Sequence, residues 1–390
     1  MAGRMTGALA GVAARFRLDG EVVRAEPHGR GHINDTYRIV CGRGRKRMRY
    51  ILQHINRQVF PDPVGQIRNI DKVLAHLRRK QEDPRRLLTL VPTLDGKAYW
   101  RDPQGEFWRV YLYIEKARSR DSVRGPRQAY EAAKLFGAFQ SSLADLSGAL
   151  AETIPGFHDT PKRYRDFARA ARRDAAGRAR EAAREIDFAG RNKEAAGILS
   201  RLAERDEVPT RIVHNDTKIN NVLFDENTGE GLCVLDLDTV MPGLSLYDFG
   251  DMVRAGVNPA AEDEPDVSKV AVRLPVFEGF ARGYLEGAAG MLNEVERAHL
   301  AASAKVISFE LGLRFLTDFL NGDRYFKTSR PGQNLDRCRT QFRLMELLSR
   351  SEGELQAIVA SAARPPFSSS RRKPGPSSSS RRRPGPRTCR

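Results

Sequence analysis

A chain of 390 residues with 40% hydrophobic and 8% aromatic content suits a soluble globular protein built from two or three core-forming units. The formal net charge is +17, but residues 365–390 hold eight Lys or Arg and no Asp or Glu, so the charge without them is +9. Much of the rest lies in an Arg- and Ala-rich span, 163–191, which is typical of a solvated helix face, and no aromatic-studded basic motif of the RNA-binding kind is present. We therefore expect no specific nucleic-acid partner.

Cysteine use and the length of the apolar runs indicate the compartment. No two cysteines form a Cys-x-x-Cys pair, and their wide spacing argues against a zinc site or a disulfide framework: Cys41, Cys233, Cys338 and Cys389. The N-terminus has no apolar core of the length of a signal peptide, and no stretch reaches the length of a membrane span. These features predict a cytoplasmic protein with no membrane partner.

The first predicted unit, residues 1–116, is small and rich in β-strands. A short amphipathic helix is expected over 9–16, and a second helix over 66–79 has apolar residues spaced three and four apart, at Ile67, Ile70, Val73, Leu74 and Leu77. Runs of β-type residues predict strands over 37–40, 48–53, 88–92, 98–100 and 107–114. Together these elements form a nucleotide-binding lobe made of a sheet with one core helix.

Two places in this lobe are predicted to contact a nucleotide. Gly29 and Gly31 precede the first of these strands, and glycine lets backbone N–H groups approach phosphates because it has no Cβ. Taken alone, this Gly-x-Gly pattern is more typical of a tight hairpin turn than of a phosphate-binding loop. The strand that leaves the lobe carries Tyr113 and Glu115, where an edge can offer main-chain groups to an adenine, with simple packing of the aromatic residues as the alternative.

The second predicted unit, residues 117–363, is mainly helical. Helical apolar spacing begins near residue 128 and returns over 163–203, 270–287, 294–321 and 335–349. The remaining segment, residues 364–390, contains a near-repeat of Ser, Arg, Pro and Gly that cannot bury enough apolar surface to offset the entropy of ordering. We predict a disordered tail that is dispensable for chemistry, with an electrostatic tether as the alternative.

The stretch 212–251 carries the candidate chemistry. A polar loop follows a short apolar run, and two β-type runs joined by a turn at 225–229 then predict a hairpin. Loop and hairpin bring Asp216, Asn221 and Asp236 together. A carboxylate that accepts a hydroxyl proton, with an amide and a second carboxylate that can hold Mg²⁺, is what phosphoryl transfer to an alcohol requires. We predict Asp216 as the base and the other two as metal ligands.

Neighbouring polar residues receive other predicted roles. Asp238 lies two residues beyond Asp236, on the same face of the predicted strand, and is either a further metal ligand or a structural acceptor. His214 follows an apolar run, so we expect it to hydrogen-bond the loop from below rather than to transfer protons. Asp248 opens an Asp-Phe-Gly triplet, but Asp236 is better placed to hold metal, so Asp248 is expected to brace the loop through backbone N–H groups.

The motifs of this stretch, HNDTKINN, VLDLDTVMPG and LYDFGD, resemble those of the aminoglycoside-phosphotransferase and choline-kinase group of kinase-like enzymes. The strings AEPHGRGHINDTYRI, YILQHINRQVFPDP, NIDKVLAHL, TIPGFHDTPKRY and FLTDFLNGDRYF are similar to the N-acetylhexosamine 1-kinase branch, over about residues 16–348. The resemblance implies a bilobal, protein-kinase-like α+β fold that uses ATP and Mg²⁺. It also implies transfer of the γ-phosphoryl group to the anomeric hydroxyl of an N-acetylhexosamine, with Asp216 as base and Asn221 and Asp236 as metal ligands.

The chain departs from the wider kinase pattern in the small lobe. Gln53 stands where a kinase strand would end in its phosphate-binding lysine, and the following helix has no obvious glutamate to pair with such a lysine. Either a nearby Arg or Lys contacts the phosphates, or the glycine loop and the metal carry more of this interaction.

The acceptor is the least defined part of the prediction. We expect contacts from the region 314–337, at Arg314, Asp318, Tyr325, Asn334 and Arg337. A small-molecule kinase acting on an amino alcohol or aminoglycoside is the first alternative, since acidic residues at 262–266 can attract a cationic acceptor. A nucleotide-binding protein without turnover is the second. The sequence carries no signal for an oligomeric state.

Overall fold

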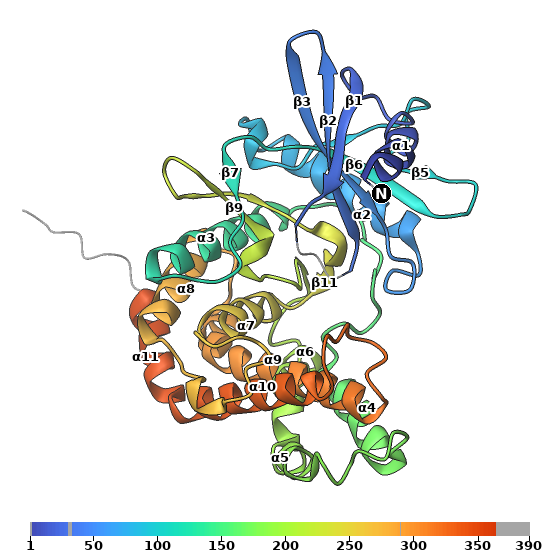
Figure 1. Cartoon of the computed structure of the whole chain (residues 1–390). Helices are drawn as coiled ribbons and strands as arrows, with labels where there is room; N and C mark the ends of the chain where they lie inside the picture. The colour runs from blue at the N-terminus through green and yellow to red at the C-terminus, as the bar shows by residue number, and fades with distance from the viewer. Residues whose placement is uncertain (1, 30–32, 289, 364–390) are drawn as a thin grey trace, which may run out of the picture.

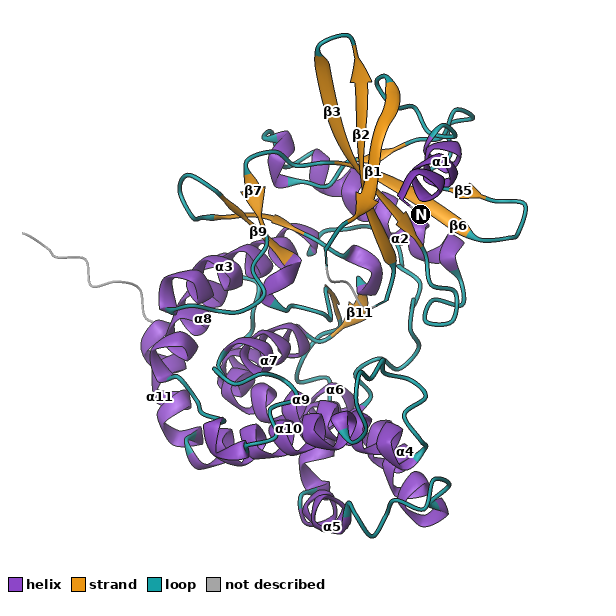
Figure 2. Ribbon diagram, in the orientation of Figure 1, coloured by secondary structure: helices purple, strands orange, loops and turns teal. Residues whose placement is uncertain are grey.

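The computed structural model describes residues 2–29, 33–288 and 290–363, and in it a β-rich lobe at the N-terminal end of the chain sits against a larger helical lobe (Figures 1 and 2). Gly31 and the tail 364–390 lie outside the described residues, so what was predicted for them stays a prediction. Within the described ranges, no helix is both long enough and apolar enough to cross a membrane.

The small lobe is built on an antiparallel sheet in the order β1-β2-β3-β6-β4, with β5 pairing β6 (Figure 2). Side chains alternate along these strands, so that residues such as Ile39 and Cys41 are fully buried between exposed or half-buried neighbours. The helix α1 (Ala2–Ala13) contributes Leu9 and Ala13 to the same core. The strands are β1 (Glu21–Pro27), β2 (Asp35–Arg43), β3 (Lys46–His54), β4 (Leu90–Val91), β5 (Trp100–Arg101) and β6 (Phe107–Leu112).

Helix α2 (Pro63–Arg78) joins this lobe to the rest of the molecule. The Asp62 side chain accepts a hydrogen bond from the Gly65 N–H at 2.9 Å, and Pro63 stands in the first turn, which together start the helix. All five residues of the predicted apolar stripe are buried. Asn69 donates to the carbonyl oxygens of Ala151 at 2.8 Å and Val240 at 3.3 Å, both in the large lobe.

The large lobe is a set of packed helices with α9 at its centre (Figure 1). Asn293 and Glu296 form a capping box at the start of α9, most of which is buried. Its helices are α3 (Pro126–Leu143), α4 (Thr160–Arg173), α5 (Ala183–Arg191), α6 (Ile198–Glu204), α7 (Ser245–Gly256), α8 (Leu274–Gly287), α9 (Glu294–Leu320), α10 (Gln333–Arg350) and α11 (Glu352–Ala362). The basic span 163–203, whose spacing predicts one helix or a pair, instead forms three helices, α4 to α6. The chain turns at Asp174 with φ +43°, which ends α4, and a short 3₁₀ helix at Lys193–Gly197 separates α5 from α6.

A stripe of glycines lets α8 lie directly on α3. A Cβ at Gly279 would come within 2.3 Å of the Pro126 carbonyl oxygen, and one at Gly283 within 2.1 Å of the Tyr130 carbonyl oxygen. Gly287, one turn further on, would meet the Lys134 carbonyl oxygen at 2.1 Å. The two helix backbones are therefore in contact along three successive turns of α8.

Two small sheets hold the stretch that carries the predicted chemistry. The strand β8 (Arg211–Val213) pairs with β11 (Met241–Gly243), and β7 (Ala117–Arg118) pairs with the hairpin β9 (Val222–Asp225) and β10 (Gly231–Val234). The predicted hairpin is present, but its second strand ends at Val234.

The end of this strand corrects the prediction that Asp236 and Asp238 share one strand face. Asp236 adopts a left-handed conformation with φ +54°, which ends the extended backbone. Residues Leu237–Thr239 then form a short 3₁₀ helix, so Asp238 follows a turn rather than a strand pleat.

Candidate active site

Asp216 lies in the loop between β8 and β9, and both its carboxylate oxygens have partners. The Lys218 ammonium is 2.9 Å from Oδ1, and the Asn221 side-chain amide donates to Oδ2 at 3.0 Å. The same amide also donates to the Asp216 carbonyl oxygen at 2.8 Å. Asn221 thus ties the end of the loop to Asp216. Its amide oxygen remains available as an acceptor for a ligand.

These contacts fix the charge state of Asp216. Burial alone would raise its pKa, but the Lys218 ammonium and then His214 and the Asn221 amide hold that pKa below its ordinary value. The same pairing raises the pKa of Lys218. Asp216 is therefore a carboxylate at neutral pH, as a proton acceptor must be. Lys218 was not singled out from the sequence, although a lysine two residues after the candidate base was a visible signal.

Asp248, on α7, braces the loop from inside the large lobe. It is fully buried, and its carboxylate accepts hydrogen bonds from the backbone N–H groups of His214 at 2.9 Å and Asn215 at 2.7 Å. Gln140, on α3, donates to the same carboxylate. Thr217 donates its hydroxyl to the Asp248 carbonyl oxygen at 2.6 Å. These contacts brace the loop, which is the role that the sequence predicts for Asp248.

His214 lies beneath the loop and is fully buried. Its Nε2 is 2.8 Å from the Leu235 carbonyl oxygen, and the ring packs edge-on against Phe136 and Phe139. Its Nδ1 accepts a hydrogen bond from the Asp216 N–H at 3.3 Å. Because both ring nitrogens are engaged with the backbone, His214 links the loop to the end of the hairpin.

A second buried histidine, which sequence reasoning missed, reaches the loop from the segment before α4. His158 Nε2 is 3.1 Å from the Asn215 carbonyl oxygen, and its Nδ1 is 2.8 Å from Glu310 on α9. Thr160 donates to the other Glu310 oxygen at 2.6 Å. The string TIPGFHDTPKRY was noted only for its resemblance, and a histidine within it gave no sign of this contact.

Asp236 lies just beyond the hairpin, and the residue as a whole is exposed. Its carboxylate is nevertheless crowded by protein, so desolvation, and then the negative charges of Asp238 and Asp216, raise its pKa to about 7. Asp236, Asp238 and Asp216, called the carboxylate cluster below, thus interact electrostatically, and their negative charge favours a cation, although within the described ranges no three His, Cys, Asp or Glu side chains are placed to hold a metal ion on their own. Carboxylate and amide oxygens are the ligands that Mg²⁺ prefers in proteins.

Asp238 differs from Asp236 because it is buried and its oxygens are already in contact with other groups. Its Oδ1 is 2.5 Å from Nη1 of Arg109, and its Oδ2 accepts a hydrogen bond from the Asn34 side chain at 2.5 Å. Arg109 lies on β6, and Asn34 lies in the loop between β1 and β2. These contacts show Asp238 as a structural acceptor, one of its two predicted roles, but each oxygen keeps a further lone pair, so the predicted role as a metal ligand stays a prediction.

Arg109 is a further residue that sequence reasoning missed. Its side chain is 1% exposed, and its Nε donates to the Gln53 side-chain oxygen at 2.9 Å. Burial opposes its charge, but Asp238 raises its pKa, so the guanidinium stays charged. The signal was a charged residue inside the apolar strand sequence FWRVYL, because a buried arginine is rare without a partner.

The predicted nucleotide contacts of the small lobe are only partly placed. Gly29 is exposed, has φ +76° and has open space around it. The N–H of Tyr113 donates to the Arg49 carbonyl oxygen at 3.1 Å, and the ring is covered by the Arg49 guanidinium. Glu115 pairs with Arg49, and its carbonyl oxygen accepts from Arg85 at 3.2 Å. The Tyr113 N–H and the Glu115 carbonyl are thus used within the protein.

The predicted acceptor residues divide into two groups. Asp318 is buried and accepts hydrogen bonds from three consecutive backbone N–H groups, those of residues 324–326, while Asn334 donates to it at 2.9 Å. These contacts hold a loop within the fold, but Asp318 also lines a pocket of about 360 Å³ together with Arg324 and Tyr325, so the predicted acceptor contacts stay a prediction. Arg314 stacks on Phe157 and Phe326.

The other two acceptor candidates are Tyr325, which is exposed, and Arg337, which lies near a charged side chain. Tyr325 is 58% exposed. Arg337 lies 3.8 Å from Glu262, which in turn lies 3.4 Å from Arg254. Arg254 is buried on α7 and also pairs with Asp251 at 2.8 Å.

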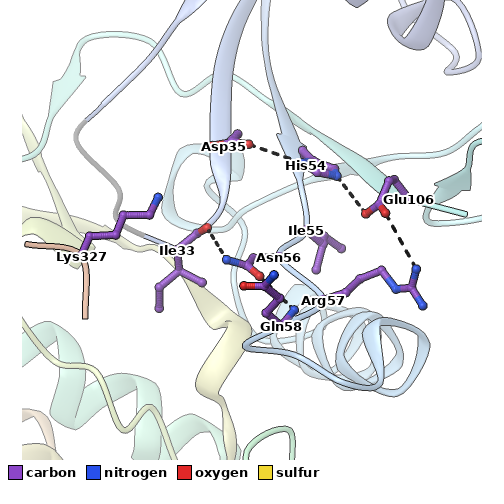
Figure 3. Close-up of a pocket in the computed structure, with 9 residues that line it drawn as sticks. All are labelled: Ile33, Asp35, His54, Ile55, Asn56, Arg57, Gln58, Glu106 and Lys327. Carbon is purple, nitrogen blue, oxygen red and sulfur yellow. Dashed lines mark hydrogen bonds and ion pairs between the residues drawn. The ribbon is translucent and has the colours of Figure 1, made fainter. Parts of the chain in front are cut away.

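A pocket of about 520 Å³ opens between the lobes beside Asn34 (Figure 3). The small lobe supplies most of its wall, and Lys327 reaches it from the large lobe. In that wall, His54 sits between Asp35 at 3.4 Å and Glu106 at 3.2 Å, and Arg57 approaches Glu106 at 3.8 Å. Its lining is Ile33, Asp35, His54, Ile55, Asn56, Arg57, Gln58, Glu106 and Lys327.

The pocket is connected to the carboxylate cluster through one residue. The Asn34 side-chain oxygen accepts from the backbone N–H of Asn56 in the pocket wall at 3.0 Å, while its amide donates to Asp238. A volume of about 520 Å³ is large enough for a monosaccharide-sized ligand.

Comparison with known proteins places these features in context. Residues 24–290 match the model of the phosphotransferase enzyme family. The chain is similar in structure to a microcompartment-associated aminopropanol kinase, with 17% identity, TM-score 0.62, and coverage of 90% of this chain and 98% of that one. A choline/ethanolamine kinase family protein from Mesorhizobium loti matches at 17% identity and TM-score 0.54, over 93% and 99% of the two chains.

A third similar structure is a spectinomycin phosphotransferase, APH(9)-Ia, solved with ADP and spectinomycin, at 12% identity and TM-score 0.55, over 90% and 98% of the two chains. At such identities these likenesses speak for the fold, which is the kinase-like fold of aminoglycoside and choline phosphotransferases. The predicted bilobal α+β fold class is confirmed.

Proposed function

Because the chain belongs to the phosphotransferase enzyme family, we propose that it transfers the γ-phosphoryl group of ATP to a sugar hydroxyl, namely the anomeric hydroxyl of an N-acetylhexosamine. The observation that carries the proposal is the ionised Asp216 carboxylate at the cleft, held by Lys218 and Asn221 beside Asp236. Membership of an enzyme family argues against the alternative of a nucleotide-binding protein without turnover.

The chain's own residues supply proton transfer and orientation. Asp216 accepts the proton of the acceptor hydroxyl as that oxygen bonds to the γ-phosphorus, and the bond to the leaving ADP oxygen breaks. Lys218 keeps Asp216 ionised, and Asn221 fixes the direction of its carboxylate. Asp248 and His214 hold the loop in place from below.

The carboxylate cluster fits Mg²⁺, with Asp236 and the amide oxygen of Asn221 as the ligands. Bound there, Mg²⁺ would neutralise charge on the phosphates of the nucleotide. We leave Asp238 out of the ligand set, because Arg109 and Asn34 contact both its oxygens.

The charges around the cleft favour a neutral acceptor over a cationic one. Glu262 lies between Arg254 and Arg337, Asp263 lies 3.7 Å from Arg330, and Glu264 lies 3.0 Å from Lys269. Three of the four acids that would attract an amino alcohol are thus paired with a cation, and the fourth, Asp266, accepts hydrogen bonds from Ser268. The pocket beside Asn34 is similar: its acids face His54 and Arg57, and Lys327 adds a positive charge.

An amino alcohol or aminoglycoside is the second candidate acceptor. Its support is that similar structures bear the names of an aminopropanol kinase and a spectinomycin phosphotransferase. These proteins share the fold at 17% and 12% identity, which leaves their acceptor pockets free to differ.

A panel of acceptors tests the proposal. ADP release is measured with N-acetylglucosamine, N-acetylgalactosamine, glucose, ethanolamine, choline and aminopropanol, and the product is identified by ³¹P NMR. We expect turnover of an N-acetylhexosamine and none of its methyl glycoside, whose anomeric oxygen is blocked. Turnover of the amino alcohols without turnover of the sugars would overturn the sugar assignment and favour the second candidate.

The variant Asp216→Asn tests the base. We expect kcat to fall by about 10²–10⁴-fold, because the amide cannot accept the hydroxyl proton, while ATP affinity stays close to that of the wild type. Activity is followed by ADP release and affinity by calorimetry. Near-normal kcat in this variant would rule out Asp216 as the base.

A further inference from the structure

The small lobe contains a buried cation, Arg109, opposite Gln53 in the sheet. Gln53 on β3 and Arg109 on β6 are direct partners in the antiparallel register, so their side chains leave the sheet on the same face. The Gln53 side-chain oxygen accepts from Arg109 Nε at 2.9 Å, and its amide donates to Thr36 at 3.1 Å. Gln53 therefore orients Arg109 rather than acting as a cation itself.

The Arg109 guanidinium reaches across the cleft to the catalytic segment. Its Nη1 is 2.5 Å from Asp238, two residues after Asp236, and Asp238 is held in turn by Asn34 of the loop between β1 and β2. Asn34, the sheet and the catalytic segment are thus linked through Asp238 and Arg109. Arg49, a cation further up β3, is turned away and pairs with Glu115.

The donors of Arg109 are not used up by these contacts. A guanidinium has five N–H donors in a planar fork, and Nε–H is the one bound to Gln53. Among the described residues, Nη1 and the Asp238 Oδ1 form an ion pair but neither has a hydrogen bond of proper geometry, although both atoms are buried. Such a fork matches the oxygens of a phosphate better than a single carboxylate oxygen.

We propose that Arg109 is the phosphate-contacting cation of the nucleotide site, taking the part for which Gln53 is unsuited, and that Asp238 and Gln53 position it. This inference rests on the proposed function, because it requires that ATP be the phosphoryl donor. The phosphate contact that a lysine on β3 makes in the wider kinase pattern is thus assigned to Arg109 on β6.

The test compares Asp238→Asn with the double variant Arg109→Met/Asp238→Asn, so that the buried carboxylate is neutral in both. ATP and adenosine binding are measured by calorimetry, with and without Mg²⁺, after thermal melts show that each variant is folded. We expect Asp238→Asn to keep or increase ATP affinity. The double variant should bind ATP about 10- to 100-fold more weakly, with adenosine affinity unchanged, because a charged contact to the phosphates is lost.

Adding Gln53→Lys to the double variant should restore ATP affinity, since it supplies a cation from the neighbouring strand. Arg118→Met, at an exposed residue of β7 that pairs with Glu226, serves as the matched control and should bind ATP as the wild type does. Equal ATP affinity in Asp238→Asn and the double variant would overturn the assignment of Arg109 alone. A wild-type protein that binds no ATP would overturn the proposed function together with it.

Discussion

The loop that carries Asp216 and the loop between β1 and β2 face each other across the cleft, but they are held in different ways. The Asp216 loop is tied to its lobe by Asp248, His214 and His158, which contact its backbone from α7, from within the loop and from the segment before α4. Among the described residues between β1 and β2, Asn34 contacts Asp238 and the Asn56 N–H, and the Ile33 carbonyl oxygen accepts from the Asn56 side chain at 3.3 Å. The Asp216 loop is thus tied to buried side chains of its own lobe, whereas the described contacts of Asn34 reach one residue in each lobe.

Removal of the brace at Asp248 should have the largest effect on stability. Asp248→Ala deprives the buried N–H groups of His214 and Asn215 of their acceptor, so we expect a loss of about 3–6 kcal/mol in the free energy of unfolding. Denaturant unfolding measures it, with Asp71→Ala on the exposed side of α2 as a control that should stay within about 0.5 kcal/mol. A loss below 1 kcal/mol in Asp248→Ala would mean that the loop does not depend on this brace.

The buried pair of His158 and Glu310 should make the stability of the same region depend on pH. Burial opposes protonation of His158, but the Glu310 carboxylate and, further off, Asp251 raise its pKa above 6.5. Burial likewise opposes ionisation of Glu310, but His158, Arg314 and Thr160 lower its pKa below 4.5. The histidine contribution is full below pH 6.5 and is lost as pH rises through its folded pKa, whereas the glutamate contribution is full above pH 4.5 and is lost as pH falls through its folded pKa.

The variant His158→Gln should therefore be destabilised most between about pH 4.5 and 6.5, by about 2 kcal/mol, and less on either side. Glutamine keeps one hydrogen bond to the Asn215 carbonyl oxygen but cannot carry the charge. Unfolding free energies of wild type and variant are compared from pH 3 to 9. A difference that stays constant over this range would show that the pair is not ionised in the folded protein.

The smallest effect on stability is expected when the side chain of Asn34, between β1 and β2, is removed. Asn34→Ala removes the bonds to Asp238 and Asn56, and we expect a loss of only about 1 kcal/mol, because Asp238 keeps Arg109. Hydrogen exchange should quicken in the loop between β1 and β2 and stay unchanged at residues 214–217. Asn227→Ala, in the exposed hairpin turn, should change neither region. Faster exchange at 214–217 in Asn34→Ala would show that the two loops are not independent.

Much of the fold was accessible from the sequence because apolar spacing sets which face of each element is buried. The stripe of α2 and most strands of the small lobe follow from spacing alone, whereas β1 was not predicted. The length of the strand before Asp236 did not follow, since its end depends on a left-handed residue that aspartate only sometimes adopts. The break after α4 was missed for the same reason, because Asp174 also adopts a left-handed conformation.

The site was predictable where the residues are close in sequence. Asp216 and Asn221 meet within one loop, and the chemistry of that spacing is readable. Contacts between distant segments were not predictable, because the partner of each residue depends on tertiary packing: Arg109 meets Asp238, and His158 meets Glu310, only through the packing of the lobes and helices. The bonds of Asp318 to the backbone of 324–326 were missed on the same ground, since they depend on how that loop closes.

The glycine stripe of α8 sets the mutational tolerance of a region far from the cleft surface. Gly279, Gly283 and Gly287 accept no side chain without parting α8 from α3. Tyr284, in the same turns, donates its hydroxyl to Gln140 of α3 at 2.7 Å, and Gln140 reaches Asp248. A library of variants selected for activity should therefore retain glycine at these three positions while it diversifies the exposed face of α8, so that an apparently remote helix behaves in selection as part of the active site.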